Sequence, residues 1–195
     1  MTILGITGGS GVGKTTALEV LREMGATCID CDAIYHTMLD KGGRMLDEIG
    51  TRFPGVVVDG KLDRPKLGQI VFHNAQALSD LNAITHGYIR DEVEWILADT
   101  FRAGGSLVAV DAVALIESGL ARGCTAVVGI IAPVALRTER IVMRDGITPD
   151  EAMIRIRGQK SDSFYREHCD YILENNTADS EAFAETCRAL FRGLI

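Results

Sequence analysis

The chain has 195 residues, of which 47% are hydrophobic and 24% charged, as expected for one soluble α/β domain with a modest insertion. A net charge of −7 gives no sequence-wide reason to bind nucleic acid or anionic lipid, so we expect neither as a partner. The longest apolar runs are too short to cross a bilayer, and the first residues lack the features of a secretory signal. We therefore expect no membrane association and a cytoplasmic protein.

Short β-branched runs alternate with longer helical stretches, which is typical of a parallel sheet covered by helices. In chain order the pattern predicts a strand at 3–7, a helix at 14–24, strands at 27–30, 107–111, 125–131 and 171–174, and an amphipathic helix at 180–191. The fold class that this order indicates is α/β, with a three-layer parallel sheet.

Two stretches with helical periodicity interrupt this alternation of strands and helices. Residues 33–104 are helical in period, apart from a short strand-like run at 56–58, and we predict a helical subdomain in which Trp95 is a packing anchor. Residues 136–164 are helical and rich in arginine, with a break at Asp145 and Gly146, and we predict a mobile lid. The core would then comprise residues 1–32 and 105–195.

Residues 8–15 match the phosphate-binding pattern G-x-x-x-x-G-K-[ST], and they lie between an apolar strand and a helix as that pattern requires. Glycines let successive backbone N–H groups point at an anion, and the helix N-terminus adds its positive dipole end. The predicted ATP-binding residues are Gly9, Ser10, Gly11, Val12, Gly13, Lys14, Thr15 and Thr16. Lys14 is expected to reach the β- and γ-phosphates, and the Thr15 hydroxyl to bind Mg²⁺.

A phosphate loop alone does not name a reaction, since GTPases, motor ATPases and kinases all carry one. No Asn-Lys-x-Asp sequence occurs, so guanine selectivity by that device is absent. The chain is also too short for a motor. These observations favour a small-molecule kinase that uses Mg-ATP.

Three carboxylates are candidates for the chemistry. Asp30 and Asp32 follow the second strand, and if the chain stays extended there, both point to one side. One would accept the proton of an attacking hydroxyl, and the other would orient Mg²⁺; alternatively, Asp32 only caps a helix that begins at Ala33. Asp111 closes an apolar strand in the manner of a Walker B carboxylate, or it bonds to a turn.

The lid arginines Arg137, Arg140 and Arg144 are spaced by three and four residues, hence along one helix face. They are candidates for stabilising the transferring phosphoryl group, or else they form a solvated face paired with acidic neighbours. Cys28 and Cys31 form a C-x-x-C pair without a second pair at zinc spacing, so buried, reduced thiols are favoured over a redox or zinc site.

Read together, these segments resemble the dephospho-coenzyme A kinase family from residue 3 to about 175. The resemblance is carried by 5–16 (GITGGSGVGKTT), 29–32 (IDCD), 60–64 (GKLDR), 67–72 (LGQIVF), 81–86 (LNAITH), 115–120 (LIESGL), Arg140, 144–146 (RDG), Gln159 and 170–175 (DYILEN). Gly87 and Val113 depart from the family pattern on the acceptor side.

The resemblance implies a P-loop NTPase core, a helical acceptor-binding insertion at 33–104 and a closing lid. It also implies transfer of the ATP γ-phosphate to the 3′-hydroxyl of dephospho-coenzyme A, the last step of coenzyme A synthesis. By position, the catalytic residues would be Lys14, Asp32 as base and Arg140. Arg144 and Asn175 would bind ATP, and Arg64, His86 and Glu117 would lie on the substrate side. Independently of the resemblance, the loop motif and the strand ends predict that Thr15, Asp30 and Asp111 contact the metal.

Two other functions remain open at this point. The first is a kinase of similar build that phosphorylates a nucleoside, a nucleotide or another small metabolite. The second is a regulatory protein that binds ATP without transferring phosphate, although such a sensor needs no base at Asp32. No interface pattern in the sequence predicts an oligomeric state.

Overall fold

The computed structural model describes all residues from 1 to 195, and it divides into two compact units. The first unit comprises residues 1–29 and 100–195, and the second comprises residues 30–99. No helix combines the length and apolar composition needed to cross a membrane. The division of the chain into a nucleotide-binding and an acceptor-binding part stays a prediction about function.

The sheet of the first unit contains five strands in the order β2-β5-β1-β6-β7. The strands are β1 (Thr2–Thr7), β2 (Thr27–Asp30), β5 (Leu107–Asp111), β6 (Ala126–Ile131) and β7 (Tyr171–Glu174). The pairs β1–β5, β1–β6 and β6–β7 are parallel. All six residues of β6 are buried, which explains why this strand is apolar without alternation. The predicted strands are confirmed to within one residue at each end.

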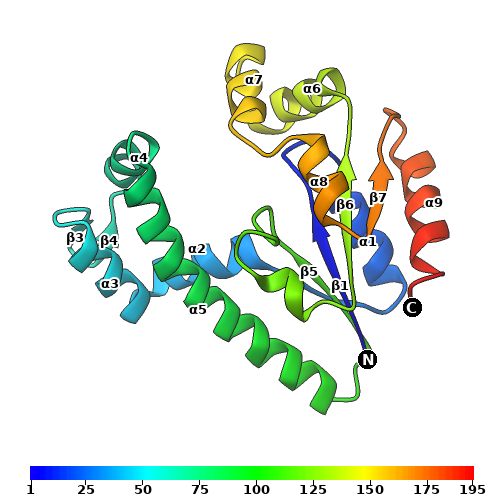
Figure 1. Cartoon of the computed structure of the whole chain (residues 1–195), viewed down its shortest axis with the longest axis horizontal. Coiled ribbons are helices and arrows are strands. Elements are labelled where there is room, and N and C mark those ends of the chain that lie inside the picture. The colour runs from blue at the N-terminus through cyan, green and yellow to red at the C-terminus, as the bar shows by residue number, and fades with distance from the viewer. The chain divides into compact units, whose positions relative to one another are not determined.

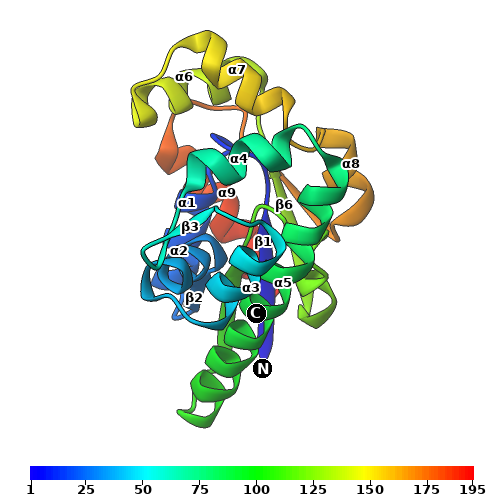
Figure 2. The same cartoon turned by 90° about the vertical axis from the view of Figure 1, so that its left-hand side faces the viewer.

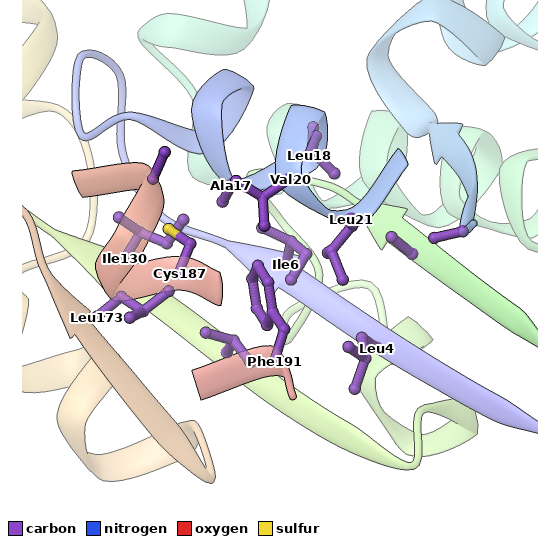
Figure 3. Close-up of a cluster of buried hydrophobic side chains, with 14 of the residues drawn as sticks. Leu4, Ile6, Ala17, Leu18, Val20, Leu21, Ile130, Leu173, Cys187 and Phe191 are labelled. Carbon is purple, nitrogen blue, oxygen red and sulfur yellow. The ribbon is translucent and has the colours of Figure 1, made fainter. Parts of the chain in front are cut away.

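One face of the sheet is covered by α1 (Lys14–Glu23) and α9 (Ser180–Phe191), which also pack against each other. Figure 3 shows side chains of β1, α1 and α9 gathered in this core. Leu4, Ile6, Leu21 and Phe191 are fully buried there. Each such side chain stabilises the fold by about 1.5–3 kcal/mol relative to exposure. The predicted helices at 14–24 and 180–191 are confirmed.

The opposite face of the sheet is packed closely at two glycines. A Cβ at Gly5 would lie 2.6 Å from Cδ2 of Leu115, and a Cβ at Gly129 would lie 2.8 Å from Sγ of Cys169. Helix α8 (Asp162–His168) packs against β6 on this unit. The absence of side chains at these two positions lets the segments after β5 and α8 approach the sheet directly.

The arginine-rich stretch forms two helices, α6 (Val134–Asp145) and α7 (Pro149–Arg157), beyond the carboxyl ends of the strands (Figures 1 and 2). They pack through a small apolar cluster of Ile141, Ala152 and Ile156. Helix α6 ends where predicted, because Gly146 adopts the left-handed conformation at φ 66°. A short 3₁₀ helix, Leu120–Gly123, precedes β6.

The second unit is mainly helical, as predicted, and has its own core. It contains α2 (Cys31–Lys41), α3 (Arg44–Arg52), β3 (Val57–Val58), β4 (Lys61–Leu62), α4 (Arg64–Phe72) and most of α5 (Ala75–Arg102). Strands β3 and β4 pair as a small antiparallel hairpin, so residues 57 and 58 of the predicted run at 56–58 form a strand. Its core residues are Leu39, Met45, Leu46, Ile49, Phe53, Val56, Leu67, Val71 and Ala77.

The prediction that Trp95 anchors the packing of this unit is wrong. Its side chain is 63% exposed, whereas Val93 is buried. Residues two positions apart on a helix lie about 200° apart around the axis, so burying Val93 turns Trp95 outward. The apolar periodicity of α5 identified a helix but not the side that it buries.

Candidate nucleotide-binding site

The loop between β1 and α1 adopts the conformation that its glycines permit. Gly8, Gly11 and Gly13 have φ values of 146°, 77° and 105°, which other residues rarely adopt. Helix α1 begins at Lys14, so its unpaired N–H groups adjoin the loop. The ammonium of Lys14 folds back across the loop and donates to the Gly8 carbonyl over 3.2 Å. The predicted strand–loop–helix arrangement is therefore present.

Side chains from outside the loop hold three successive carbonyl groups. Arg137 Nε donates to the Ser10 carbonyl at 3.0 Å, and Arg140 donates to the Gly11 carbonyl at 3.0 Å. Asn175 Nδ2 donates to the Val12 carbonyl at 2.9 Å. In a trans peptide the N–H points opposite to the C=O. Holding these carbonyls outward therefore turns the next three N–H groups toward the inside of the loop, where an anion would bind.

The loop glycines also allow this close approach. A Cβ at Gly13 would lie 2.4 Å from Asn175 Nδ2, and a Cβ at Gly11 would lie 2.7 Å from the Arg137 carbonyl oxygen. A side chain at position 13 would push the tethering amide of Asn175 away, and one at position 11 would push the backbone of α6 away. Either would also strain a left-handed backbone. Both glycines thus serve the packing around the loop in addition to its curvature.

Asn175 was predicted to bind ATP, and it lies where β7 ends. The residue is 3% exposed, and its own N–H extends the β6–β7 ladder by donating to the Ile131 carbonyl at 2.8 Å. Its Oδ1 accepts from Arg140 at 3.3 Å. Asn175 thus joins the end of the sheet to the loop, and a direct contact with nucleotide stays a prediction.

Arg140 was predicted to be a catalytic lid cation. Besides Gly11, its guanidinium contacts Asn175 and the Thr177 carbonyl, the latter at 2.6 Å, and burial lowers its pKa. It therefore lies between the loop and the segment after β7.

Arg144 pairs with its neighbour Asp145, which also pairs with Arg155 of α7. The hydrogen bond from Arg144 is the main reason that the Asp145 pKa falls to about 2.

Two residues that contact the loop, Arg137 and Gln159, were predicted only as part of the lid, without a contact to the loop. Arg137 is 4% exposed, and burial lowers its pKa. Gln159, between α7 and α8, accepts from the Ser10 N–H at 2.9 Å and from Arg137 at 2.8 Å, and it donates to the Ser10 hydroxyl at 2.8 Å. The spacing of the three lid arginines gave a signal for Arg137, but it did not distinguish which of them would be buried.

The predicted carboxylates lie at the ends of two strands. Asp30 Oδ1 accepts from the Ala33 N–H at 2.9 Å, so Asp30, not Asp32, caps the helix, which begins at Cys31. The expectation of an extended chain here is wrong, because the helix starts directly after β2. Asp32 lies exposed in its first turn. The assignments of Asp32 as base and of Asp30 as metal contact stay predictions.

A magnesium ion fits the donor groups near the loop. Thr15 presents a hydroxyl in the first turn of α1, and Asp111 ends β5, in register with Ile6 of β1. Mg²⁺ prefers oxygen donors, and it is ordinarily held by one or two protein groups together with phosphates and water. Thr15 and Asp111 supply that kind of donor set.

The predicted acceptor residues have defined surroundings. Arg64 contacts Nδ1 of His36 at 2.6 Å and Asp40 at 3.4 Å within the second unit. His86 lies half-buried on α5. In the first unit, Glu117 lies 3.9 Å from the Lys160 ammonium. Their roles toward an acceptor stay predictions.

All five cysteines are free thiols. Burial raises the pKa of Cys124 and Cys169 to about 11 and that of Cys187 to about 12. Burial also raises the pKa of Cys28, the first residue of the C-x-x-C pair. These thiols remain protonated at neutral pH, as expected for packed, unreactive cysteines.

Comparison with known proteins gives a consistent result. The sequence profile described as "Dephospho-CoA kinase" matches residues 2–181. A dephospho-CoA kinase of Deinococcus radiodurans is 38% identical, covering 89% of this chain and 83% of the relative. A dephospho-CoA kinase of Moorella thermoacetica is 34% identical, covering 100% of this chain and 92% of the relative. A solved structure from Thermus thermophilus superposes with a TM-score of 0.80 at 28% identity, covering 100% of this chain and 98% of the other. The P-loop kinase fold is thereby confirmed, and the chain belongs to the dephospho-CoA kinase family of ATP-dependent phosphotransferases.

Proposed function

We propose that the protein transfers the γ-phosphoryl group of Mg-ATP to the 3′-hydroxyl of dephospho-CoA. The observation that carries the proposal is the phosphate loop, whose successive carbonyls are held outward by three side chains. Such a loop binds a polyanion through backbone N–H groups, which explains how a chain of net charge −7 accommodates ATP. Membership of the dephospho-CoA kinase family supports the choice of acceptor.

Lys14 would contact the β- and γ-phosphates, and Thr15 with Asp111 would hold Mg²⁺. When bound, Mg²⁺ neutralises charge that develops on the phosphate oxygens. Arg140 and Arg144 are the lid cations proposed to act on the phosphate tail. Phosphoryl transfer requires little covalent chemistry from a protein, so positioning and electrostatic stabilisation account for most of the expected acceleration.

Asp32 is the proposed general base. Its carboxylate would accept the proton of the ribose 3′-hydroxyl while that oxygen bonds to the γ-phosphorus. The bond from the γ-phosphorus to the β–γ bridging oxygen would break in line, and ADP would leave with that electron pair. Arg64, His86 and Glu117 are proposed to hold the acceptor. The cytoplasmic location expected from the sequence stays a prediction.

A panel of acceptors tests the proposal. The protein with Mg-ATP would be incubated with dephospho-CoA, adenosine, AMP, shikimate or gluconate, and ADP release would be followed for each. We expect rapid release with dephospho-CoA alone, and NMR of the product should place the new phosphate on the 3′-oxygen. Turnover with another acceptor would identify a different kinase, and ATP binding without acceptor-dependent turnover would indicate an ATP sensor.

A further inference from the structure

Tyr165 buries a hydroxyl group that makes no hydrogen bond within the protein. The residue belongs to α8, which packs against β6, and only 2% of its surface is exposed. Its hydroxyl oxygen is buried and has no hydrogen-bonding partner. A phenylalanine would fill the same volume at lower cost, because burying an unpaired polar group destabilises a folded protein. Buried hydroxyls are ordinarily paired, so this one points to a partner that joins it in another state of the site.

The titratable groups around this hydroxyl come from the segment after β5, from α6 and from the ends of α8. Burial raises the pKa of Tyr165 to about 12, and the Glu117 carboxylate is the next largest influence, also raising it. Arg137 acts in the opposite sense, and Cys169 and Asp162 add smaller increases. The hydroxyl is therefore neutral at physiological pH, and Glu117 is the charged group that affects it most.

A neutral hydroxyl can donate only to a group that accepts a hydrogen bond. Arg137 carries donors alone, and the Cys169 sulfur is a weak acceptor. Asp162 lies exposed in the first turn of α8, and after burial, which lowers the pKa of Arg137, its carboxylate is the largest influence on that pKa. Glu117 is thus the carboxylate best suited to accept from Tyr165. Hydrogen bonds to an ionised carboxylate are among the stronger ones in proteins.

Glu117 is only loosely held beside α8. Its carboxylate lies 3.9 Å from the Lys160 ammonium, and the two side chains are 32% and 49% exposed. Lys160 in turn lies over the ring of Phe164, 4.8 Å from its centroid, one residue before Tyr165. A partly exposed ion pair of this length contributes little and does not fix the orientation of the carboxylate. Glu117 is therefore free to turn from the lysine toward the tyrosine.

We propose that Tyr165 is a positioning residue for the acceptor, whose hydroxyl donates to the Glu117 carboxylate when the acceptor is bound. The inference rests on the proposed function, in which Glu117 contacts the acceptor. A bound acceptor excludes water from Glu117, and a hydrogen bond to a carboxylate is stronger in such a drier site. The hydroxyl then contributes to acceptor binding, whereas in the free protein it contributes nothing to stability.

The substitution Tyr165→Phe removes the hydroxyl and keeps the ring. The thermal midpoint should stay unchanged or rise, because a buried unpaired group is lost. The dissociation constant of dephospho-CoA, measured by calorimetry with Mg²⁺ and a non-hydrolysable ATP analogue, should rise about tenfold, and that of the analogue should change less than about threefold. Tyr171→Phe, at a 40% exposed tyrosine that begins β7, is the matched control and should change none of these quantities.

Glu117→Gln identifies the partner of the hydroxyl through a double-mutant cycle. Glutamine keeps the shape of the side chain but is a weaker acceptor, so adding Tyr165→Phe to it should weaken dephospho-CoA binding by less than about twofold. Equal effects of Tyr165→Phe in both backgrounds would assign the hydroxyl to another partner and overturn the proposal.

Two further outcomes of Tyr165→Phe would also overturn it. Unchanged dephospho-CoA affinity would show that the hydroxyl serves a buried water or nothing at all. A lower thermal midpoint, with equal weakening of both ligands, would show a purely structural role. A wild type that fails to bind dephospho-CoA would refute the proposed function, and this inference with it, whereas normal binding by Tyr165→Phe beside a functional wild type would refute the inference alone.

Discussion

Asn175→Ala tests whether the end of the sheet holds the phosphate loop in shape. The substitution removes the donor to the Val12 carbonyl, and Val12 is only 1% exposed. A buried carbonyl left without a partner costs about 1–3 kcal/mol. Arg140 loses its hydrogen bond to Oδ1 of Asn175 but keeps those to the Gly11 and Thr177 carbonyls. The loss of this one bond therefore adds little to the destabilisation. We expect a decrease of about 2 kcal/mol in the free energy of unfolding.

In a chain of this length that decrease corresponds to a fall of roughly 4–8 °C in the thermal midpoint. Urea denaturation and differential scanning calorimetry would measure it, and the KM for ATP should rise because the Gly13 N–H loses its orientation. Asn176→Ala is the matched control, since the adjacent Asn176 is exposed and bonds only to Glu174. It should change stability by less than about 0.5 kcal/mol. Equal effects of the two substitutions would refute the tethering role.

Three further outcomes are expected. Lys14→Ala should reduce turnover by at least a hundredfold, because it removes an ammonium from the terminal-phosphate end of the loop; near-normal kinetics would contradict that placement. Asp32→Asn should lower kcat about a hundredfold or more while leaving ATP affinity unchanged, and a collapse of ATP binding would show that Asp32 is structural or linked to the metal. Asp145→Asn should destabilise α6 and α7. The Asp145 pKa of about 2 lies below its usual value, so the ionised carboxylate stabilises the folded state. The urea midpoint of the wild type should therefore exceed that of the variant above about pH 4, and the difference should vanish toward pH 2.

Local sequence patterns predicted the sheet and the loop well, for physical reasons. Buried parallel strands such as β6 require uninterrupted apolar residues, and the loop requires glycines at positions of positive φ. Both requirements can therefore be recognised from the residue types along the sequence. The end of α6 at Gly146 was predictable on the same ground, because the left-handed terminus favours glycine.

The contacts around the loop were less accessible from the sequence. Arg137, Arg140 and Arg144 share a helix face by spacing, yet Arg137 is buried, and Arg144 pairs with Asp145 near solvent. Which of them is covered depends on how α6 docks, and this is decided by residues distant in the chain such as Gln159 and Asn175. Asp30 shows a local version of this limit. From the sequence, the chain after Asp30 could either stay extended or begin a helix. In the structure it begins a helix, and Asp30 caps that helix by accepting from the Ala33 N–H.

The three tethered carbonyls explain how the lid and the loop depend on each other. Arg137 and Arg140 come from α6, and Asn175 follows β7, so the loop is held by an arginine-rich helix on one side and by the sheet on the other. Backbone N–H groups bind an anion well only when they already point at it, since reorienting them would use part of the binding energy. Arg137 and Arg140 are thus engaged with the loop before any phosphate arrives. A change in α6 should therefore alter ATP affinity even where no side chain of α6 touches the nucleotide.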